Sequence, residues 1–157
     1  MKKLSRIIAI VALLVTMAAC SSDRYEAKLF SVEVPSGFVP DEDADTNFSL
    51  FNYVQFNTPS DKSTFVIMAF PFDGNPESLL YNQTLGGANP ALTSMNYPTG
   101  RLEAFTFGSH SGYEIEMSGY IEGIKVTGTS YSFTEDGCTF FVYDLSTDGR
   151  NTDLTAR

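Results

Sequence analysis

Hydrophobic and polar side chains alternate along much of the chain after residue 28, which is the pattern of β-strands. The alternation is cleanest at 113–118, where the sequence reads YEIEMS and predicts a strand with one buried and one solvated face. Two other segments, 64–70 and 138–145, carry apolar residues on both sides. Because strands of that kind lie in the middle of a covered sheet, we expect these two at its centre.

Shorter alternating segments predict three further strands, at 29–34, 48–56 and 102–107. In the second half of the chain, Glu122-Gly123 and Asp136-Gly137 predict two tight hairpin turns. Such turns join neighbouring antiparallel strands, so this half of the chain is expected to form a meander.

The strand between those two turns changes face along its length. Its apolar residues are Ile124 and Val126 at the start but Tyr131 and Phe133 at the end, which have the opposite parity. A change of parity predicts a bulge or bend, which we place at Gly128.

Two helix starts follow the strand at 64–70. Asn75 is an N-cap residue, Pro76 suits the first helical position, and Glu77 lies near the positive end of the helix dipole. The glycine pair at 86–87 ends this helix, and an Asn-Pro pair at 89–90 begins a second, shorter one. We therefore expect one or two short helices packed on one face of the sheet.

Together these elements predict an α+β fold: a mostly antiparallel, twisted sheet of about six or seven strands with the helices on one face. The segments FSVEVPSGF at 30–38, NPESLLYNQTLGG at 75–87, GYEIEMSGY at 112–120 and SYSFTEDGCTFFVYDLS at 130–146 resemble the PsbP-like fold, which includes the Mog-type Ran-binding proteins. That resemblance implies a binding or assembly module more often than an enzyme. The alternative fold is a lipocalin-like β-barrel.

The first 22 residues carry a secretion signal. Basic residues precede an apolar run at 7–15, and small residues follow it. The tetrapeptide MAAC at 17–20 resembles the lipobox of bacterial lipoproteins, which implies cleavage before Cys20 and lipidation of its sulfur. Ser21 resembles the outer-membrane pattern, with the periplasmic or surface side left open. An ordinary cleaved signal and an uncleaved anchor are the alternatives.

The expected organisation follows from these segments. A signal peptide occupies 1–19, the lipidated Cys20 and a polar tether occupy 20–28, a single domain occupies 29–148, and a polar tail occupies 149–157. Cleavage would leave 138 of the 157 residues and change the net charge from −9 to about −12. A chain this acidic will not hold nucleic acid through its phosphates. Cys138 would be the one free thiol, which we expect to be a buried hydrophobic residue.

Few residues suggest metal or nucleophilic chemistry. His110 is the only histidine, and its setting GSHSG predicts an exposed hairpin tip. One histidine and one free cysteine cannot make a zinc site. Asp41, Asp43 and Asp45 alternate as in a calcium loop, but the glycine and glutamate that such a loop requires are missing. We expect a solvated acidic loop that is only a weak candidate for calcium, and no cofactor.

The strand at 113–118 places Glu114 and Glu116 on one face, about 6.5–7 Å apart, which overlaps the spacing of glycosidase carboxylates. A carboxylate-dependent hydrolase of an envelope or extracellular glycan is therefore one candidate function. The more direct interpretation is that both glutamates form the solvated side of an amphipathic strand.

Exposed aromatic residues are the other candidate site. The expected strands leave four rings on solvated sides: Phe51, Tyr53, Tyr120 and Tyr131. Aromatic surfaces flanked by acids suit a sugar, a peptide or a partner protein. We therefore expect a non-catalytic binding or assembly module, attached to the membrane through lipid on Cys20. Its ligand would be an unidentified protein or small extracellular molecule.

Overall fold

The computed structural model describes residues 24–44, 46–47, 50–60, 62–93, 100–107 and 110–147. Its strands are β1 (Arg24–Glu26), β2 (Ser31–Glu33), β3 (Val39–Pro40), β4 (Thr46–Asn47), β5 (Asn52–Asn57), β6 (Ser63–Phe70), β7 (Glu103–Phe107), β8 (His110–Ile121), β9 (Ile124–Glu135) and β10 (Cys138–Ser146). Its helices are α2 (Pro76–Gln83) and α3 (Pro90–Thr93).

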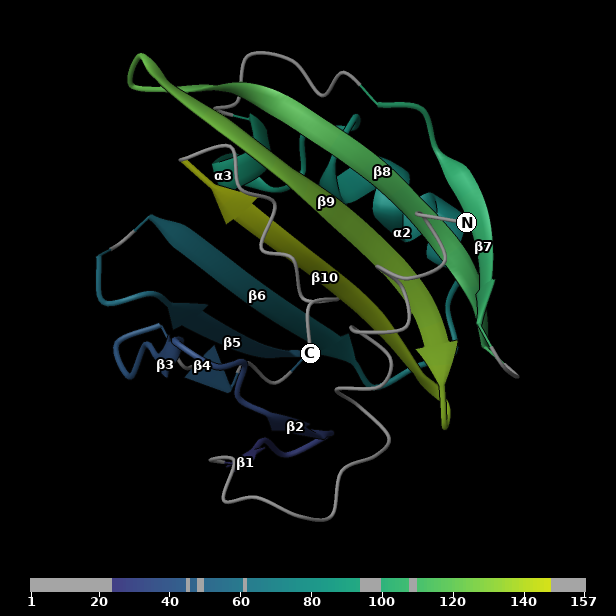
Figure 1. Ribbon diagram of the computed structural model, residues 1–157. Helices are drawn as coiled ribbons and strands as arrows, with labels where there is room; N and C mark the ends of the chain where they lie inside the picture. Colours follow the sequence, from purple (N-terminus) through teal and green to yellow (C-terminus); the bar gives the residue numbers. More distant parts are fainter. Residues whose placement is uncertain are drawn as a thin grey trace.

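The main sheet is open and antiparallel (Figure 1). Its strand order is β3-β5-β6-β10-β9-β8-β7, and β4 also pairs with β5. In the part of the chain that the structure describes, β3 and β7 form the two edges and do not pair with each other. This confirms the expected antiparallel sheet with a helix packed on it, and the lipocalin-like barrel is wrong.

The two strands that are apolar on both sides lie side by side at the centre of the sheet. β6 and β10 pair from Ser63↔Ser146 to Phe70↔Thr139. One face of this pair contributes Ile67 and Val142 to a first core, and the other face contributes Val66 and Phe141 to a second. Val66, Ile67, Phe141 and Val142 are all buried, so both faces of the pair are covered at its centre.

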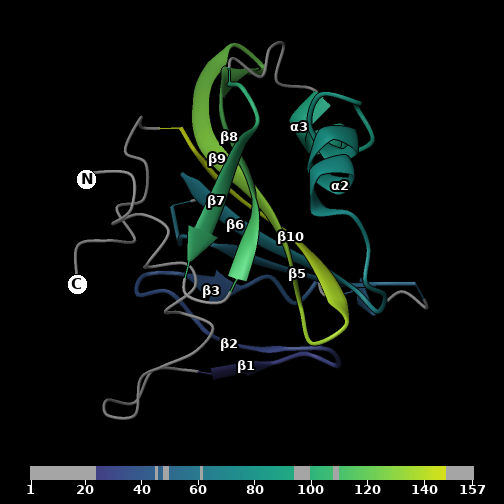
Figure 2. The same ribbon diagram turned by 90° about the vertical axis from the view of Figure 1, so that its right-hand side faces the viewer.

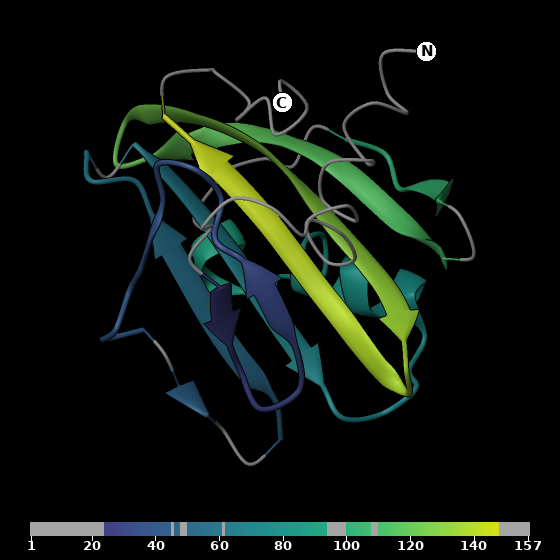
Figure 3. The same ribbon diagram turned by 60° about the horizontal axis from the view of Figure 1, so that its bottom comes forward.

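Different layers cover the two faces. The helices α2 and α3 lie on one face, which we call the helix face (Figure 2). The β1–β2 hairpin lies on the opposite face, over β5, β6 and β10 (Figure 3). Edge-to-face aromatic contacts hold the hairpin there: the ring centroids of Tyr25 and Phe56 are 5.6 Å apart, and those of Phe30 and Phe140 are 6.0 Å apart.

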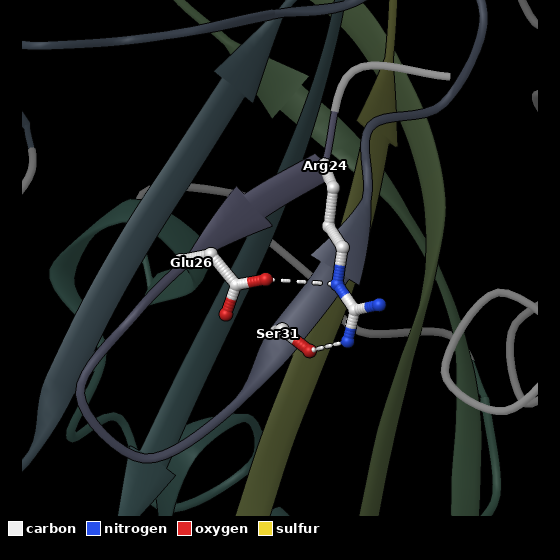
Figure 4. A network of polar contacts seen from close by, with 3 residues as sticks. All are labelled: Arg24, Glu26 and Ser31. Carbon is white, nitrogen blue, oxygen red and sulfur yellow. Dashed lines mark hydrogen bonds and ion pairs between the residues drawn. The ribbon is translucent and has the colours of Figure 1, made fainter. Parts of the chain in front are cut away.

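The β1–β2 hairpin corrects two expectations. The tether predicted at 20–28 contains a strand, because β1 pairs with β2 and contributes Tyr25 to the core. The guanidinium of Arg24 forms an ion pair with Glu26 and donates a hydrogen bond to the Ser31 hydroxyl (Figure 4). The strand predicted at 29–34 is accordingly part of this small hairpin and not of the main sheet.

Both predicted hairpin turns are confirmed. Glu122 and Gly123 have φ values of 51° and 80°, and Asp136 and Gly137 have φ values of 50° and 75°. Two successive positive φ values are typical of type I′ turns, whose twist matches that of the flanking strands. The meander β8–β9–β10 follows from these turns.

The bulge predicted at Gly128 is wrong. β9 pairs without interruption with β8, from Gly112↔Phe133 to Ile121↔Ile124, and with β10 along its other side. The change of parity has a different cause, because both faces of β9 are buried. Its even-numbered residues face α2, where Ser130 and Ser132 are fully buried and small enough for the helix to approach. The odd-numbered Tyr131 and Phe133 belong to the opposite core.

Both predicted helix starts are confirmed. The side-chain oxygen of Asn75 accepts a hydrogen bond of 2.9 Å from the backbone N–H of Ser78, and Pro76 occupies the first turn. Leu80 is the buried residue of α2, and Leu92 of α3 is buried in the same core. Both helices are short, and neither described helix is long and apolar enough to cross a membrane.

Several expectations fall outside the described residues. They are the signal peptide at 1–19, Cys20, Asp45 and the polar tail at 149–157. The strand predicted at 48–56 begins at Asn52, with 48–49 outside the described part, and the side chain of Leu50 is 73% exposed.

Candidate functional site

A hollow of about 430 Å³ lies on the helix face of the sheet. Its floor consists of side chains from β5, β6 and β10 and the residue before β5, namely Phe51, Tyr53, Met68, Phe70 and Tyr143. Its wall consists of the last residue of α2, the connection that follows and the first residue of α3, namely Gln83, Ala88, Asn89 and Pro90. The volume is within the range of small-ligand sites, about 300–1,000 Å³.

The hollow exists because α2 covers only part of the helix face. The helix packs over β8, β9 and β10, so the β5–β6 half of the same face extends beyond it (Figure 2). On β5, the alternation then places Val54 and Phe56 in the opposite core and leaves Tyr53 half-buried on the helix face. The floor of the hollow is therefore a part of the sheet that lacks a helix above it.

Hydrogen bonds fix the polar groups of the floor. A side-chain hydrogen bond joins the hydroxyls of Tyr143 and Tyr53. The Tyr53 hydroxyl donates to Oε1 of Gln55 at 2.8 Å. Nε2 of Gln55 donates to Oδ1 of Asn57 at 3.0 Å and to Oδ2 of Asp41 at 3.4 Å, and Nδ2 of Asn57 donates to the same Asp41 oxygen at 3.0 Å. The floor is thus linked through Gln55 and Asn57 to Asp41 of the acidic loop.

Both tyrosines of the floor stay protonated at neutral pH. Burial raises the pKa of Tyr53, and the negative charge of Asp41 raises it further, although the hydrogen bond with Tyr143 acts in the opposite direction. Burial raises the pKa of Tyr143 still more strongly, with Tyr53 as a further cause. Since the other lining side chains are apolar rings, thioether, alkyl groups and amides, the lining carries no formal charge.

Aromatic rings continue from the hollow to the open surface. The rings of Phe51 and Phe70 have centroids 5.3 Å apart, and those of Phe70 and Phe72 are 5.7 Å apart. We call these three residues the aromatic row. Phe72, at its outer end, is 53% exposed, which is unusual for a phenylalanine and typical of a contact surface.

The structure brings together two of the four predicted aromatic residues. Phe51 and Tyr53 both line the hollow. Tyr131 is only 5% exposed and packs edge-to-face on Phe105 in the core, so its prediction as a surface residue is wrong. Tyr120 is 54% exposed, but it lies opposite Lys125 near the β8–β9 turn and on the other face of the sheet.

Sequence reasoning missed Met68, Phe70 and Tyr143 as floor residues. All three belong to β6 or β10, which are apolar on both sides. That pattern indicates a covered strand, and nothing local in it tells which residues the helix leaves uncovered. For Phe51 and Tyr53 the sequence did carry a signal. The alternation of the segment 48–56 placed both of them on its less apolar side.

The other candidates lie away from the hollow. Glu114 and Glu116 point to the face opposite α2, where they are paired across the sheet with Tyr131 and Thr129. His110 begins β8 and pairs with Phe107, so it flanks the predicted hairpin tip and does not lie at its end. Its side chain is outside the described part.

The first carboxylate of the acidic loop, that of Asp41, accepts hydrogen bonds within the protein. Besides the bonds to Gln55 and Asn57, Oδ1 of Asp41 accepts a hydrogen bond of 3.2 Å from the backbone N–H of Asp43. Within the described ranges, no group of three His, Cys, Asp or Glu residues could hold a metal ion. Cys138 is a free cysteine, half-buried at the edge of the hairpin-side core, so it is less buried than expected.

No protein-family model matches this chain, and no curated protein matches it either. The hollow, with the row of rings that leads out of it, is accordingly the feature from which a function can be inferred.

Proposed function

We propose that this protein is a lipid-anchored binding module of the cell envelope, and that the hollow is its site for a partner protein or a small extracellular ligand. The observation that carries the proposal is the uncharged aromatic floor of Phe51, Tyr53, Phe70 and Tyr143 on the uncovered half of the helix face. Rings supply a large apolar contact area, and a few placed hydroxyls and amides orient what is bound.

The floor is also preorganised for binding. Tyr53 is held through Gln55 and Asn57, and Tyr143 is held by Tyr53, so these rings lose little freedom when a ligand arrives. Since immobilising a side chain on binding costs about 0.5–1.5 kcal/mol, prior fixation favours affinity. The tyrosine hydroxyls have raised pKa values and therefore serve as hydrogen-bonding groups and not as nucleophiles.

The leader supports the location. A lipid on Cys20 would hold the module at a membrane, and the attachment would be stable because lipoproteins carry more than one acyl chain. The residue after it, Ser21, resembles the outer-membrane pattern. Confinement to a surface raises the effective concentration of a weak binder. Because the chain has a net charge of −9, we do not expect it to bind nucleic acid through its phosphates.

Replacing Cys20 with alanine should release the protein from the membrane fraction, because the sulfur that carries the lipid is lost. The matched control is Cys138→Ala, which removes the other thiol and should leave the protein in the membrane fraction. Fractionation followed by immunoblotting measures both. If Cys20→Ala stays membrane-bound and unprocessed, the leader is an ordinary signal anchor.

Phe51→Ala and Tyr53→Ala should each weaken ligand binding about tenfold or more, since truncating a central aromatic residue of an interface commonly costs about 2 kcal/mol. The full chain, purified in detergent, would be screened on peptide and glycan arrays, and hits would be titrated calorimetrically. Tyr120→Ala is the control, because it removes an exposed ring from the other face. Hits that are lost with Tyr120→Ala but kept with both hollow variants would place the site elsewhere.

The carboxylate-pair hydrolase makes a different prediction in the same screen. Glu114 and Glu116 lie on the face opposite the hollow, so a hydrolase would be insensitive to Phe51→Ala. Turnover of any arrayed glycan that disappears in Glu114→Gln would contradict the binding module and favour the enzyme.

A further inference from the structure

We infer that the hollow and the aromatic row bind a short extended peptide segment of a partner protein, in which apolar or aromatic residues are flanked by lysine or arginine. The inference deepens the proposed function and rests on it. It is carried by two observations: the length of the apolar surface and the charges at its ends.

The apolar surface is longer than the hollow. From Phe51 through Phe70 to Phe72, two ring-to-ring steps of 5.3 and 5.7 Å lead from the floor to the open surface. An extended chain covers that length with about three residues. A single sugar or other small molecule held in the hollow would contact Phe51 and Phe70 but leave Phe72 in water, whereas a peptide segment would cover all three rings.

Carboxylates stand at both ends of this surface. At the inner end, Asp41 is joined to Tyr53 through Gln55, and its charge is one of the causes that raise the pKa of Tyr53. At the outer end, Asp73 follows Phe72 directly, and Glu77 lies in the first turn of α2. Both are exposed and so are available to a partner.

No lysine or arginine among the described residues lines the hollow or belongs to the aromatic row. The local field is therefore negative at both ends, in a chain whose net charge is −9. A basic segment would be attracted and oriented by this field, and an acidic one would be repelled. Lysine and arginine side chains can also lie against the faces of the exposed rings.

The test is selection from a random twelve-residue peptide display library on the full chain in detergent, at low ionic strength. We expect enriched peptides to carry aromatic or aliphatic residues next to lysine or arginine, and their binding to be lost with Tyr53→Ala. The double variant Asp73→Asn/Glu77→Gln should weaken a selected peptide about three- to tenfold, as expected from two exposed charge pairs. The matched control, Glu122→Gln/Asp136→Asn, removes the same charge at two distant hairpin turns and should change binding less than about twofold.

The remaining outcomes distinguish a failure of the peptide inference from a failure of the proposed binding function. Peptides that need Tyr53 but show no basic bias would overturn this inference and leave the binding module standing. So would glycans that bind through the hollow while no peptide does. Binding that is indifferent to both Phe51→Ala and Tyr53→Ala would overturn the hollow as a site, and this inference with it.

Discussion

Leu80→Ala should lower the free energy of unfolding by about 2–5 kcal/mol, the usual cost of truncating a fully buried leucine. Leu80 is completely buried and is the buried residue of α2. The residue before it, Leu79, is only partly buried against the same core. The attachment of α2 to the sheet therefore depends on a single side chain to an unusual degree.

Chemical denaturation followed by circular dichroism measures this effect. Tyr81→Ala is the matched control, because Tyr81 is in the same helix and 52% exposed, and we expect it to change stability by less than about 0.5 kcal/mol. Similar losses for the two variants would mean that α2 does not pack through Leu80. Since the connection after α2 forms the wall of the hollow, Leu80→Ala should also weaken ligand binding in the protein that remains folded.

Gly128→Ala should destabilise the domain by about 3 kcal/mol, the upper end of the usual cost of overpacking, because the new methyl group has no room. A Cβ atom at Gly128 would lie 1.8 Å from the backbone oxygen of Asp144 on the neighbouring strand β10. That backbone cannot move away easily, since Oδ1 of Asp144 accepts a buried hydrogen bond of 2.9 Å from the N–H of Thr129. The substitution must therefore separate the two strands or break this bond.

Gly37→Ala is the control for Gly128→Ala, measured by thermal and urea unfolding. Gly37 has a φ of +86° and no atom within 4 Å of the added Cβ, so alanine there costs only the left-handed backbone conformation, about 1–2 kcal/mol. The difference between the two losses of unfolding free energy gives the cost of the steric clash alone. Equal costs would show that β9 and β10 do not approach as closely at Gly128 as the structure has them.

In the proposed binding site, contact area and charge are supplied by different residues. The lining of the hollow is uncharged, whereas Asp73 and Glu77 outside it are exposed. We therefore expect affinity to come from the rings and steering to come from these carboxylates. Variants of Phe51 or Tyr53 should mainly speed dissociation, because they remove contact area. Variants of Asp73 and Glu77 should mainly slow association and weaken its dependence on salt.

The sequence alone determined the features that depend on neighbouring residues. Asn75 and Pro76 start a helix because the cap and the first turn are made within four residues. Asp136-Gly137 makes a hairpin because those two residues accept positive φ. The strands β6 and β10 are central because residues that are apolar on both sides cannot face water. From such features the class of fold follows.

Which side chains remain accessible depends on contacts that form only in the folded domain. Phe51 and Tyr131 both occupied predicted strands with a solvated side, yet Tyr131 is buried against Phe105 and Phe51 lines a hollow. The difference arises because α2 stops short of β5 and β6, whereas Phe105 of β7 packs on Tyr131 on the other face. Both are contacts between segments far apart in the chain, and local alternation carries no information about them.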